Sequence, residues 1–512
     1  MENTIVELSR GGIKDSEDLA VLKRRMAKKY RLPCPDNISL LKTYHEMVKN
    51  KRMKKSEKIE SLLRTRPIRS LSGIVNISVL TKPYPCPGRC LYCPIEKGIP
   101  KSYVSGEPAV ERAKKLNYDP YQQTKRRIEM LNFEGHPTDK IELRVVGGTW
   151  SYYPKSYQNW FVKRCFDACN EKKSKDIKES QKINEGADHR MVGLSIETRP
   201  DFINEKEIKR LRELGVTMVE LGVQSIYDNV LKKNLRGHGI KETIAATKLL
   251  KDAGFKVLYQ MMPNLPGSNQ KRDEKMFEEL FQNADFQPDL LKIYPCALLK
   301  EAPLYKLWKK GGYKPYTQSQ LIKLVKSIKK SIPYYVRIQR ITRDIPSSSV
   351  LGGAAKISNL RQLLSQKIKK EGWQCKCIRC REVKEKYNPK EKVCLFREDY
   401  LASGGKEIFL SFEDRKRMKL YSLLRLRITS GSKAFIREVH TYGFQLPING
   451  DSSSLISPQH KGLGRKLMKE AERITKKELN LKKIAVISGV GVRPYFRGLG
   501  YELENTYMVK SL

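Results

Sequence analysis

Long hydrophobic runs are missing from this chain of 512 residues. No apolar stretch reaches the roughly 18 residues that a membrane-spanning helix needs, and the N-terminus lacks the order of charged, apolar and small residues found in signal peptides. The cysteines cluster at short spacings instead of spreading as a disulfide framework. We therefore expect a cytoplasmic protein with reduced thiols and no membrane contact.

Acidic residues are scarce relative to basic ones. Asp and Glu number 56 against 101 Lys and Arg, which gives a formal net charge of +45. This excess is larger than solubility requires and indicates a polyanionic partner. A lysine-rich proteome would give the same bias without any partner. The length predicts about two to four modules.

The first module, residues 1–72, is basic and helical in pattern, and we predict it to be a helical arm. Leu19, Leu22 and Met26 recur at helical spacing, which indicates a folded segment and not a loose tail. The alternative is a solvated basic helix without a partner. The candidate phosphate contacts are Lys28, Lys29, Arg64 and Arg66.

Cys86, Cys90 and Cys93 form a C-x3-C-x2-C pattern shortly after an apolar, β-branched run. Three thiolates on one loop can hold a [4Fe-4S] cluster and leave one iron free to chelate a small molecule, which is the arrangement of radical S-adenosylmethionine (SAM) enzymes. A zinc knuckle lacking a ligand, or chance clustering, is the alternative. Zinc sites favour paired C-x2-C modules, and no second pair follows nearby.

Residues 73–348 alternate short apolar runs with longer amphipathic ones, which predicts a parallel β/α partial barrel. The predicted strands are 74–80, 141–146, 191–196, 216–222, 255–261, 290–294 and 334–338. Ligands of such barrels bind at the carboxyl ends of the strands.

Five residues at these strand ends are candidate SAM contacts. Tyr92 could stack on an adenine, and Gly147 and Gly148 could admit the amino-acid end of the ligand, although a lone glycine pair is also an ordinary turn. Glu197 could accept from a ribose or ammonium group, and Arg199 could pair with a carboxylate.

A third segment, residues 349–400, carries Cys375, Cys377 and Cys380 in a C-x-C-x2-C pattern. Such a set can supply a structural zinc site in a segment too short for its own core. Reduced free cysteines or a second iron-sulfur cluster are the alternatives. No histidine lies nearby, so Cys394 and Cys296 are the candidates for a fourth ligand.

Residues 401–512 change character, with strand-like runs at 420–428 and 434–442. Gln459, Gly462 and Gly464 then form a Q-x-x-G-x-G loop that opens an amphipathic helix. Backbone N–H groups at a helix N-terminus suit a pyrophosphate, and acyl-CoA is the ligand most often held this way. A dinucleotide site would place its glycines after the first strand of a βαβ unit.

From about residue 60 onward, the chain resembles the catalytic subunit of Elongator and its archaeal and bacterial relatives, the tRNA uridine(34) carboxymethyl synthases. The resemblance rests on many ordered motifs, among them LLRTRPIRSLSG, TKPYPCPGRCLYCP, GEPAVERAKKLNYDPY, SIETRP, ELGVQS, CKCIRCRE, AFIREVHTYG, QHKGLGRKLM and RPYFRGLGY. It implies an α/β multidomain protein: a radical SAM barrel, a zinc-bearing linker and a GNAT-type acetyltransferase domain.

The family's functional residues carry over with two departures. Its cluster ligands fall on Cys86, Cys90 and Cys93, and its acetyl-CoA loop falls on Gln459, Gly462 and Gly464. Its tyrosine pair near the acyl site falls on Tyr495 and Phe496, so the chain would rely on Tyr495, Tyr501 or water for handling the thioester. The glycine pair usual after the third cluster cysteine is Ile95-Glu96 here.

The resemblance implies modification of the wobble uridine of tRNA to 5-carboxymethyluridine, with SAM and acetyl-CoA and through a SAM-derived radical. Further Elongator-type subunits or a second copy of the chain are possible partners. Two alternatives stand beside it. One is a protein lysine acetyltransferase with a structural iron-sulfur domain and Glu438 as its general base. The other is a tRNA-binding scaffold that has lost catalysis.

Overall fold

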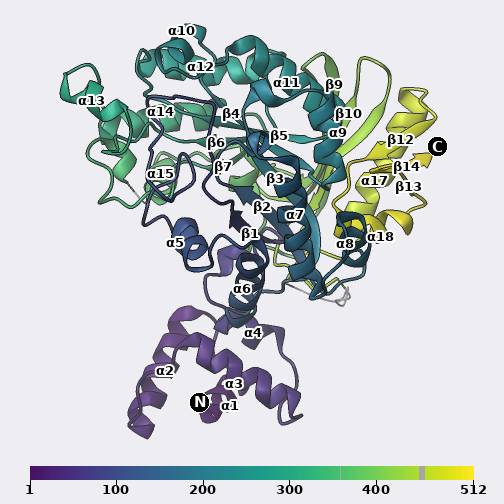
Figure 1. Ribbon diagram of the computed structural model, residues 1–512. Helices are drawn as coiled ribbons and strands as arrows, with labels where there is room; N and C mark the ends of the chain where they lie inside the picture. The colour runs from purple at the N-terminus through teal and green to yellow at the C-terminus, as the bar shows by residue number, and fades with distance from the viewer. Residues whose placement is uncertain (358, 449–455) are drawn as a thin grey trace.

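The computed structural model describes residues 1–357, 359–448 and 456–512. Its first part is a separate helical lobe below the main body (Figure 1), built from α1 (Glu2–Ser9), α2 (Ser16–Tyr30), α3 (Asn37–Lys49) and α4 (Glu57–Leu63). The lobe has its own apolar core, in which Leu22, Tyr44 and Leu63 are almost fully buried. Asp15 and Asp36 cap α2 and α3 by accepting hydrogen bonds from backbone N–H groups of the first turn.

The second part is a parallel seven-stranded sheet in which the strands are neighbours in chain order. Its strands are β1 (Val75–Leu80), β2 (Lys140–Val146), β3 (Arg190–Thr198), β4 (Met218–Gln224), β5 (Lys256–Met261), β6 (Leu290–Ile293) and β7 (Arg337–Arg340). All six adjacent pairs are parallel. The predicted parallel partial barrel is confirmed.

Helices cover the outside of this sheet (Figure 1). They are α5 (Pro108–Lys115), α6 (Pro120–Phe133), α7 (Lys155–Asn170), α8 (Ile177–Asn184), α9 (Glu205–Glu213), α10 (Asp228–Lys233), α11 (Ile240–Asp252), α12 (Gln270–Gln282), α13 (Leu304–Lys309) and α14 (Gln318–Ser331). The main apolar core lies between these helices and the outward face of the strands. The inward face is left for polar residues, because side chains of a strand alternate between the two faces.

A short connection with α15 (Leu360–Lys370) and α16 (Ile378–Arg381) leads to a second, mixed sheet. Its strands are β8 (Val393–Ala402), β9 (Gly405–Asp414), β10 (Leu420–Ile428), β11 (Ala434–Thr441), β12 (Lys483–Val486), β13 (Glu502–Glu504) and β14 (Tyr507–Ser511), with α17 (Leu463–Arg473) and α18 (Arg493–Arg497). Only β11 and β12 pair in parallel. Strand β8 falls inside residues 349–400, so the second sheet begins earlier than the predicted boundary at 401.

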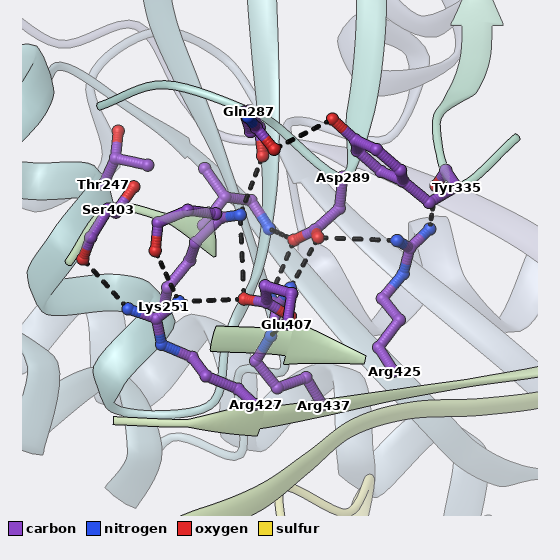
Figure 2. A network of polar contacts seen from close by, with 12 residues as sticks. Thr247, Lys251, Gln287, Asp289, Tyr335, Ser403, Glu407, Arg425, Arg427 and Arg437 are labelled. Atoms are coloured by element: carbon purple, nitrogen blue, oxygen red, sulfur yellow. Dashed lines mark hydrogen bonds and ion pairs between the residues drawn. The ribbon is translucent and has the colours of Figure 1, made fainter. Parts of the chain in front are cut away.

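The two sheets are joined by a buried network of charged side chains (Figure 2). Arg437 of β11 donates to both oxygens of Asp289, at 2.6 and 2.8 Å, and to Glu407 of β9 at 2.9 Å. Arg425 lies 3.5 Å from Asp289, and Lys251 of α11 lies 3.7 Å from Glu407. All five side chains are at most 1 % exposed, so the charges compensate one another out of contact with water.

In the part of the chain that the structure describes, no helix is long and apolar enough to cross a membrane.

Candidate active site

The cysteine loop follows β1 at the carboxyl end of the sheet. Cys90 and Cys93 are buried and Cys86 is half-buried. A Cβ added at Gly88 would lie 3.5 and 3.7 Å from the sulfurs of Cys90 and Cys86, so the glycine leaves room between the two thiols. The sulfurs of Cys86 and Cys90 therefore flank one space, and Cys93, three residues further on, would complete the three ligands of a cluster with one open iron.

Two arginines supply positive charge to this loop. The Arg236 Nη1 lies 3.6 Å from the Cys90 sulfur. Arg199 is bound through Nε and Nη2 to Asp201, and its Nη1 is buried and lacks a partner within the protein. That Nη1 would lie 2.6 Å from a Cβ at Gly88. Arg199 thus faces the cysteine loop, where its charge fits a negatively charged cluster, and its pairing with a SAM carboxylate stays a prediction.

A cavity of about 580 Å³, here called the carboxyl-end cavity, opens beside the loop. Tyr92, Cys93 and Glu197 line it. The Tyr92 hydroxyl is buried beside the Cys90 thiol, and burial raises its pKa well above the ordinary value. It has no other hydrogen-bond partner among the described residues, so a ligand in this cavity could accept a hydrogen bond from it.

Glu197 belongs to a polar network that its own sequence neighbourhood did not reveal. It accepts hydrogen bonds from Tyr103 at 3.2 Å and from Gln260 at 3.1 Å. Lys292 of β6 pairs with both Glu197 and Glu220. Burial raises the pKa of Glu197, Lys292 lowers it and Glu220 raises it, with a net upward shift. These hydrogen bonds hold the Glu197 carboxylate at the wall of the carboxyl-end cavity.

Gly147 and Gly148 do not line either large cavity. Both have positive φ, 131° and 108°. A Cβ on Gly147 would lie 2.1 Å from the Thr81 hydroxyl. Glycine is needed at position 147 because the turn packs against Thr81 at the end of β1, and contact of Gly147 and Gly148 with SAM stays a prediction.

Arginines gather at the mouth of the carboxyl-end cavity. Arg66, Arg69, Arg112 and Arg127 all line it. Burial and then the neighbouring guanidinium groups of Arg112, Arg69 and Arg66 lower the pKa of Arg127 to about 10, although Glu134 counteracts them. Such mutual repulsion is relieved by an anion, so this arginine rim is suited to phosphate groups.

The four predicted phosphate contacts differ in their positions. Lys28 and Lys29 are exposed on the last turn of α2, and Arg66 is exposed at the arginine rim. Arg64 is buried instead: its Nε donates to the Gly135 carbonyl at 2.7 Å and its guanidinium lies over the Phe444 ring. Arg64 therefore holds the helical lobe against the main body.

Cys375, Cys377 and Cys380 form a second group, with all sulfurs within 4.8 Å of one another. That spacing suits a single metal ion. Neither Cys394, which is on β8, nor Cys296 joins the group within the described ranges. The residue found beside it is Lys329, whose Nζ lies 3.3 Å from the Cys380 sulfur.

A second cavity, about 730 Å³, lies between the two sheets and is here called the interdomain cavity. Gln459, Gly462 and Gly464 line it, and α17 begins directly after Gly462. Nothing lies within 4 Å of a Cβ at Gly462, so the N-terminus of α17 is open to an anionic group. Strands β11 and β12 pair only over Ala434–Ile436, and beyond that point both line the cavity.

The Gln459 side chain is used inside the protein. It donates to the carbonyls of Gly73 and Thr441, at 3.0 and 3.1 Å, and accepts from Lys140 at 2.8 Å. It therefore ties the cavity loop to β2 and β11 and does not offer a free amide to a ligand.

Of the three predicted catalytic residues, Glu438 and Tyr495 line the interdomain cavity and Tyr501 does not. Tyr501 is buried in the second core, where its hydroxyl donates to Glu472 at 2.9 Å. Tyr495 is 42 % exposed, and its hydroxyl lies 3.3 Å from a Cβ built at Gly464. Phe496 lines the cavity beside it, so Tyr495 supplies the hydroxyl of this pair.

Glu438 is held between two cations. It pairs with Lys256 at 3.2 Å and with Arg425 at 2.8 Å. Burial raises the pKa of Glu438, but Lys256, Arg425 and His440 together lower it to about 2. A carboxylate with so low a pKa is a poor proton acceptor at neutral pH, which disfavours the lysine acetyltransferase alternative.

Family models match two consecutive parts of the chain. The Radical SAM superfamily model covers residues 84–280, and the Radical_SAM C-terminal domain model covers residues 288–370. Together with the parallel sheet and the cysteine loop, these matches define a radical SAM enzyme.

Relatives match nearly the whole chain. The tRNA uridine(34) acetyltransferase of Methanocaldococcus infernus is 45 % identical over 100 % of this chain and 98 % of its own length. Elongator complex protein 3 of Homo sapiens is 39 % identical over 97 % of this chain and 93 % of its own length. A solved structure of the archaeal Methanocaldococcus infernus Elp3 with an N-terminal deletion (1-46) is 46 % identical, covers 86 % of this chain and 100 % of that chain, and gives a TM-score of 0.76. The chain belongs to the family of tRNA uridine(34) acetyltransferases and Elongator complex protein 3.

Sequence reasoning missed the residues that act through distant contacts. Arg236, Lys292 and Gln260 come from separate strands and loops and meet only in the folded barrel. The arginines of α5 and α6 carried a signal, since they lie on basic helices that follow the cysteine loop, but their convergence at the cavity needed the structure.

Proposed function

We propose that this enzyme modifies carbon 5 of the wobble uridine of tRNA, forming 5-carboxymethyluridine from acetyl-CoA. The observation that carries the proposal is the pair of cavities at the two ends of one barrel. One cavity lies beside the three-cysteine loop, and the other lies at a helix N-terminus suited to a pyrophosphate. The names of the relatives support tRNA as the substrate.

Three roles follow for the residues around the cysteine loop. Cys86, Cys90 and Cys93 would hold a [4Fe-4S] cluster, and Arg199 and Arg236 would offset its charge. The cluster with SAM supplies, when bound, the one-electron chemistry that removes a hydrogen atom from the acetyl methyl group. Tyr92, Glu197 and the network around Lys292 would orient the ligand in the carboxyl-end cavity.

The acyl chemistry is assigned to the second sheet, which we interpret as a GNAT-type domain. The open N-terminus of α17 would bind the pyrophosphate of acetyl-CoA, and Tyr495 is placed to meet the thioester. A carbon–carbon bond forms between the acetyl methyl carbon and carbon 5 of uracil. The ring is restored by loss of the carbon-5 proton and of one electron, for which an oxidised iron-sulfur cluster held by Cys86, Cys90 and Cys93 would be the acceptor, and hydrolysis of the thioester by water releases CoA.

The basic surfaces would bind the tRNA. The arginine rim surrounds the carboxyl-end cavity, so phosphates on either side of a base inserted there would contact Arg66, Arg69, Arg112 and Arg127. Anticodon-loop bases are easier to splay out than bases in a duplex. Lys28 and Lys29 on the helical lobe would contact the tRNA further away. The group Cys375, Cys377 and Cys380 would hold a structural zinc ion.

Nucleoside mass spectrometry tests the proposal. Unmodified tRNA is incubated anaerobically with the reconstituted enzyme, dithionite, SAM and acetyl-CoA labelled in the methyl carbon. We expect labelled 5-carboxymethyluridine that disappears in Cys90→Ala. A protein with a full cluster that yields no labelled nucleoside would reject the proposal, and acetylated lysines in the same sample would favour the lysine acetyltransferase alternative.

A further inference from the structure

The two cavities are separated by a single layer of inward-facing residues. On β3, Gly193 lines the interdomain cavity and Glu197 lines the carboxyl-end cavity, with Ser195 between them on the same face. On β1 and β5 the corresponding intervening residues are Asn76 and Leu258. The residues lining the two cavities are thus four positions apart along β3, about 13 Å at the rise of a strand.

On β2 the residues that line the two cavities are only two positions apart, and they form an ion pair with each other. Glu142 lines the interdomain cavity and Arg144 lines the carboxyl-end cavity. The Arg144 Nε and Nη2 donate to Glu142 at 2.9 and 2.6 Å. When the side-chain amide of Gln339 is oriented with its oxygen toward Arg144, both amide groups find suitable partners. The oxygen then accepts hydrogen bonds from Arg144 Nη1 at 3.1 Å and Nη2 at 2.7 Å. Because Gln339 belongs to β7, Arg144 spans the barrel from β2 to its far edge.

The space inside the parallel sheet between the two cavities is here called the lumen. Its wall has a polar and an apolar side. Ser195 Oγ and Glu220 Oε1 are buried and lack hydrogen-bond partners in the described part of the chain. Met218, Leu258 and Leu290 form a small apolar cluster separate from the main core. Unpartnered buried polar atoms carry an energetic cost that a hydrogen-bonding guest would remove. Amide groups joined by methylene units, as in the pantetheine arm of CoA, match both sides of such a wall.

Movement of the two domains cannot easily bring the cavities together. The network around Asp289 joins the sheets through charges that are fully buried. Opening the interface would leave those charges without partners in a poorly hydrated environment. The acyl group must therefore travel while the domains stay in place.

We propose that the barrel lumen is the passage through which the acyl end of acetyl-CoA moves from the interdomain cavity to the carboxyl-end cavity, with Arg144 as its gate. This inference rests on the proposed function, since it takes acetyl-CoA as the ligand of the interdomain cavity. When Arg144 leaves Glu142 and Gln339, the polar side of the lumen opens over Ser195. Arg144 is a positioning residue here and takes no part in the bond changes.

Disulfide trapping with the mixed disulfide of CoA and 2-thiopyridine tests the passage without any turnover. The variant Ser195→Cys places a thiol in the lumen in place of an unpartnered hydroxyl. The introduced thiolate attacks the CoA sulfur, the sulfur–sulfur bond of the probe breaks, and 2-thiopyridone leaves. The cluster-loaded protein is treated anaerobically, and peptide mass spectrometry then measures CoA attached at position 195 apart from the native cysteines.

The matched control is Leu194→Cys, because Leu194 is as buried as Ser195 but packs in the main core outside the lumen. We expect labelling at position 195 at least tenfold faster than at position 194, and slowed at least fivefold by excess acetyl-CoA. Adding Arg144→Ala to Ser195→Cys should raise the labelling rate at least tenfold, whereas Arg144→Lys should change it less. Circular dichroism confirms that the variants are folded.

Calorimetric titration with CoA separates the two possible failures. If CoA binds and position 195 is labelled no faster than position 194, the passage is refuted and the proposed function stands. An unchanged labelling rate in Arg144→Ala would refute the gate. If CoA does not bind at all, both the passage and the proposed function fail.

Discussion

Replacement of Asp289 by alanine should strongly destabilise the joined domains. The substitution removes the carboxylate that Arg437 contacts at 2.6 and 2.8 Å and that Arg425 faces at 3.5 Å, while both guanidinium groups stay at most 1 % exposed. It also removes the acceptor of the Val257 N–H at 2.8 Å. Breaking a buried ion pair by removing one partner typically costs about 3–5 kcal/mol. We expect a loss of that size for Asp289→Ala.

The assay is urea unfolding followed by circular dichroism, with melting temperature as a second measure. Asp289→Asn keeps the shape and one acceptor, so it isolates the charge and should cost less. Asp188→Ala, at an exposed aspartate, is the matched control and should change stability by less than about 0.5 kcal/mol. A loss below about 1 kcal/mol for Asp289→Ala would refute the account of the network as the element that holds the domains together.

The pH dependence of stability follows from the same group. Burial raises the pKa of Asp289, but Arg437, Lys251 and Arg425 lower it well below the ordinary value. Since the unfolded carboxyl titrates near pH 4, its contribution is complete above about pH 4 and is lost as the pH falls toward the folded pKa. The difference in stability between wild type and Asp289→Asn should therefore shrink on acidification, which urea titrations at stepped pH would measure.

Three further predictions concern the sites. Replacing Arg112 and Arg127 together by glutamine should weaken tRNA binding and lower the magnitude of the slope of log K against log salt by about 1–2. The control Lys370→Gln on α15 should leave the slope nearly unchanged. An unchanged slope in the double variant would exclude the arginine rim from phosphate contact. Glu438→Gln should reduce nucleoside formation by less than about tenfold. It should also shift no inflection of the pH profile of the rate between pH 5 and 8, because the pKa of this carboxylate is already about 2. A loss above about a hundredfold would show that Glu438 acts as a general base. Cys377→Ser should lower bound zinc, measured by elemental analysis, and the melting temperature together, and a full zinc content in that variant would contradict the three-cysteine site.

The parallel sheet could be predicted because buried strands read as continuous apolar runs bounded by turns. All seven predicted runs overlap strands of the structure. The cysteine loop was equally clear, since its spacing is local. Strand β8 was missed because its residues alternate in burial along an exposed edge and contain charged side chains, a weaker signal than a buried run.

Residues whose partners are distant in sequence could not be placed in advance. Arg64, predicted as a phosphate contact, is buried against Gly135 and Phe444 in other parts of the chain. Arg199, predicted to pair with a ligand carboxylate, also pairs with Asp201 two residues away. Tyr501, predicted at the acyl site, donates to Glu472 within the second core. In each case the residue type was informative and the tertiary contact decided its role.

If the proposed function is right, the acetyl methyl group meets the SAM-derived radical inside this protein. This can be tested by supplying acetyl-CoA with a fully deuterated methyl group, SAM, dithionite and tRNA, and determining the mass of the 5′-deoxyadenosine that is released. We expect 5′-deoxyadenosine to gain one deuterium when tRNA is present. Unlabelled 5′-deoxyadenosine accompanying modified tRNA would contradict this expectation, because the hydrogen atom would then have come from another position.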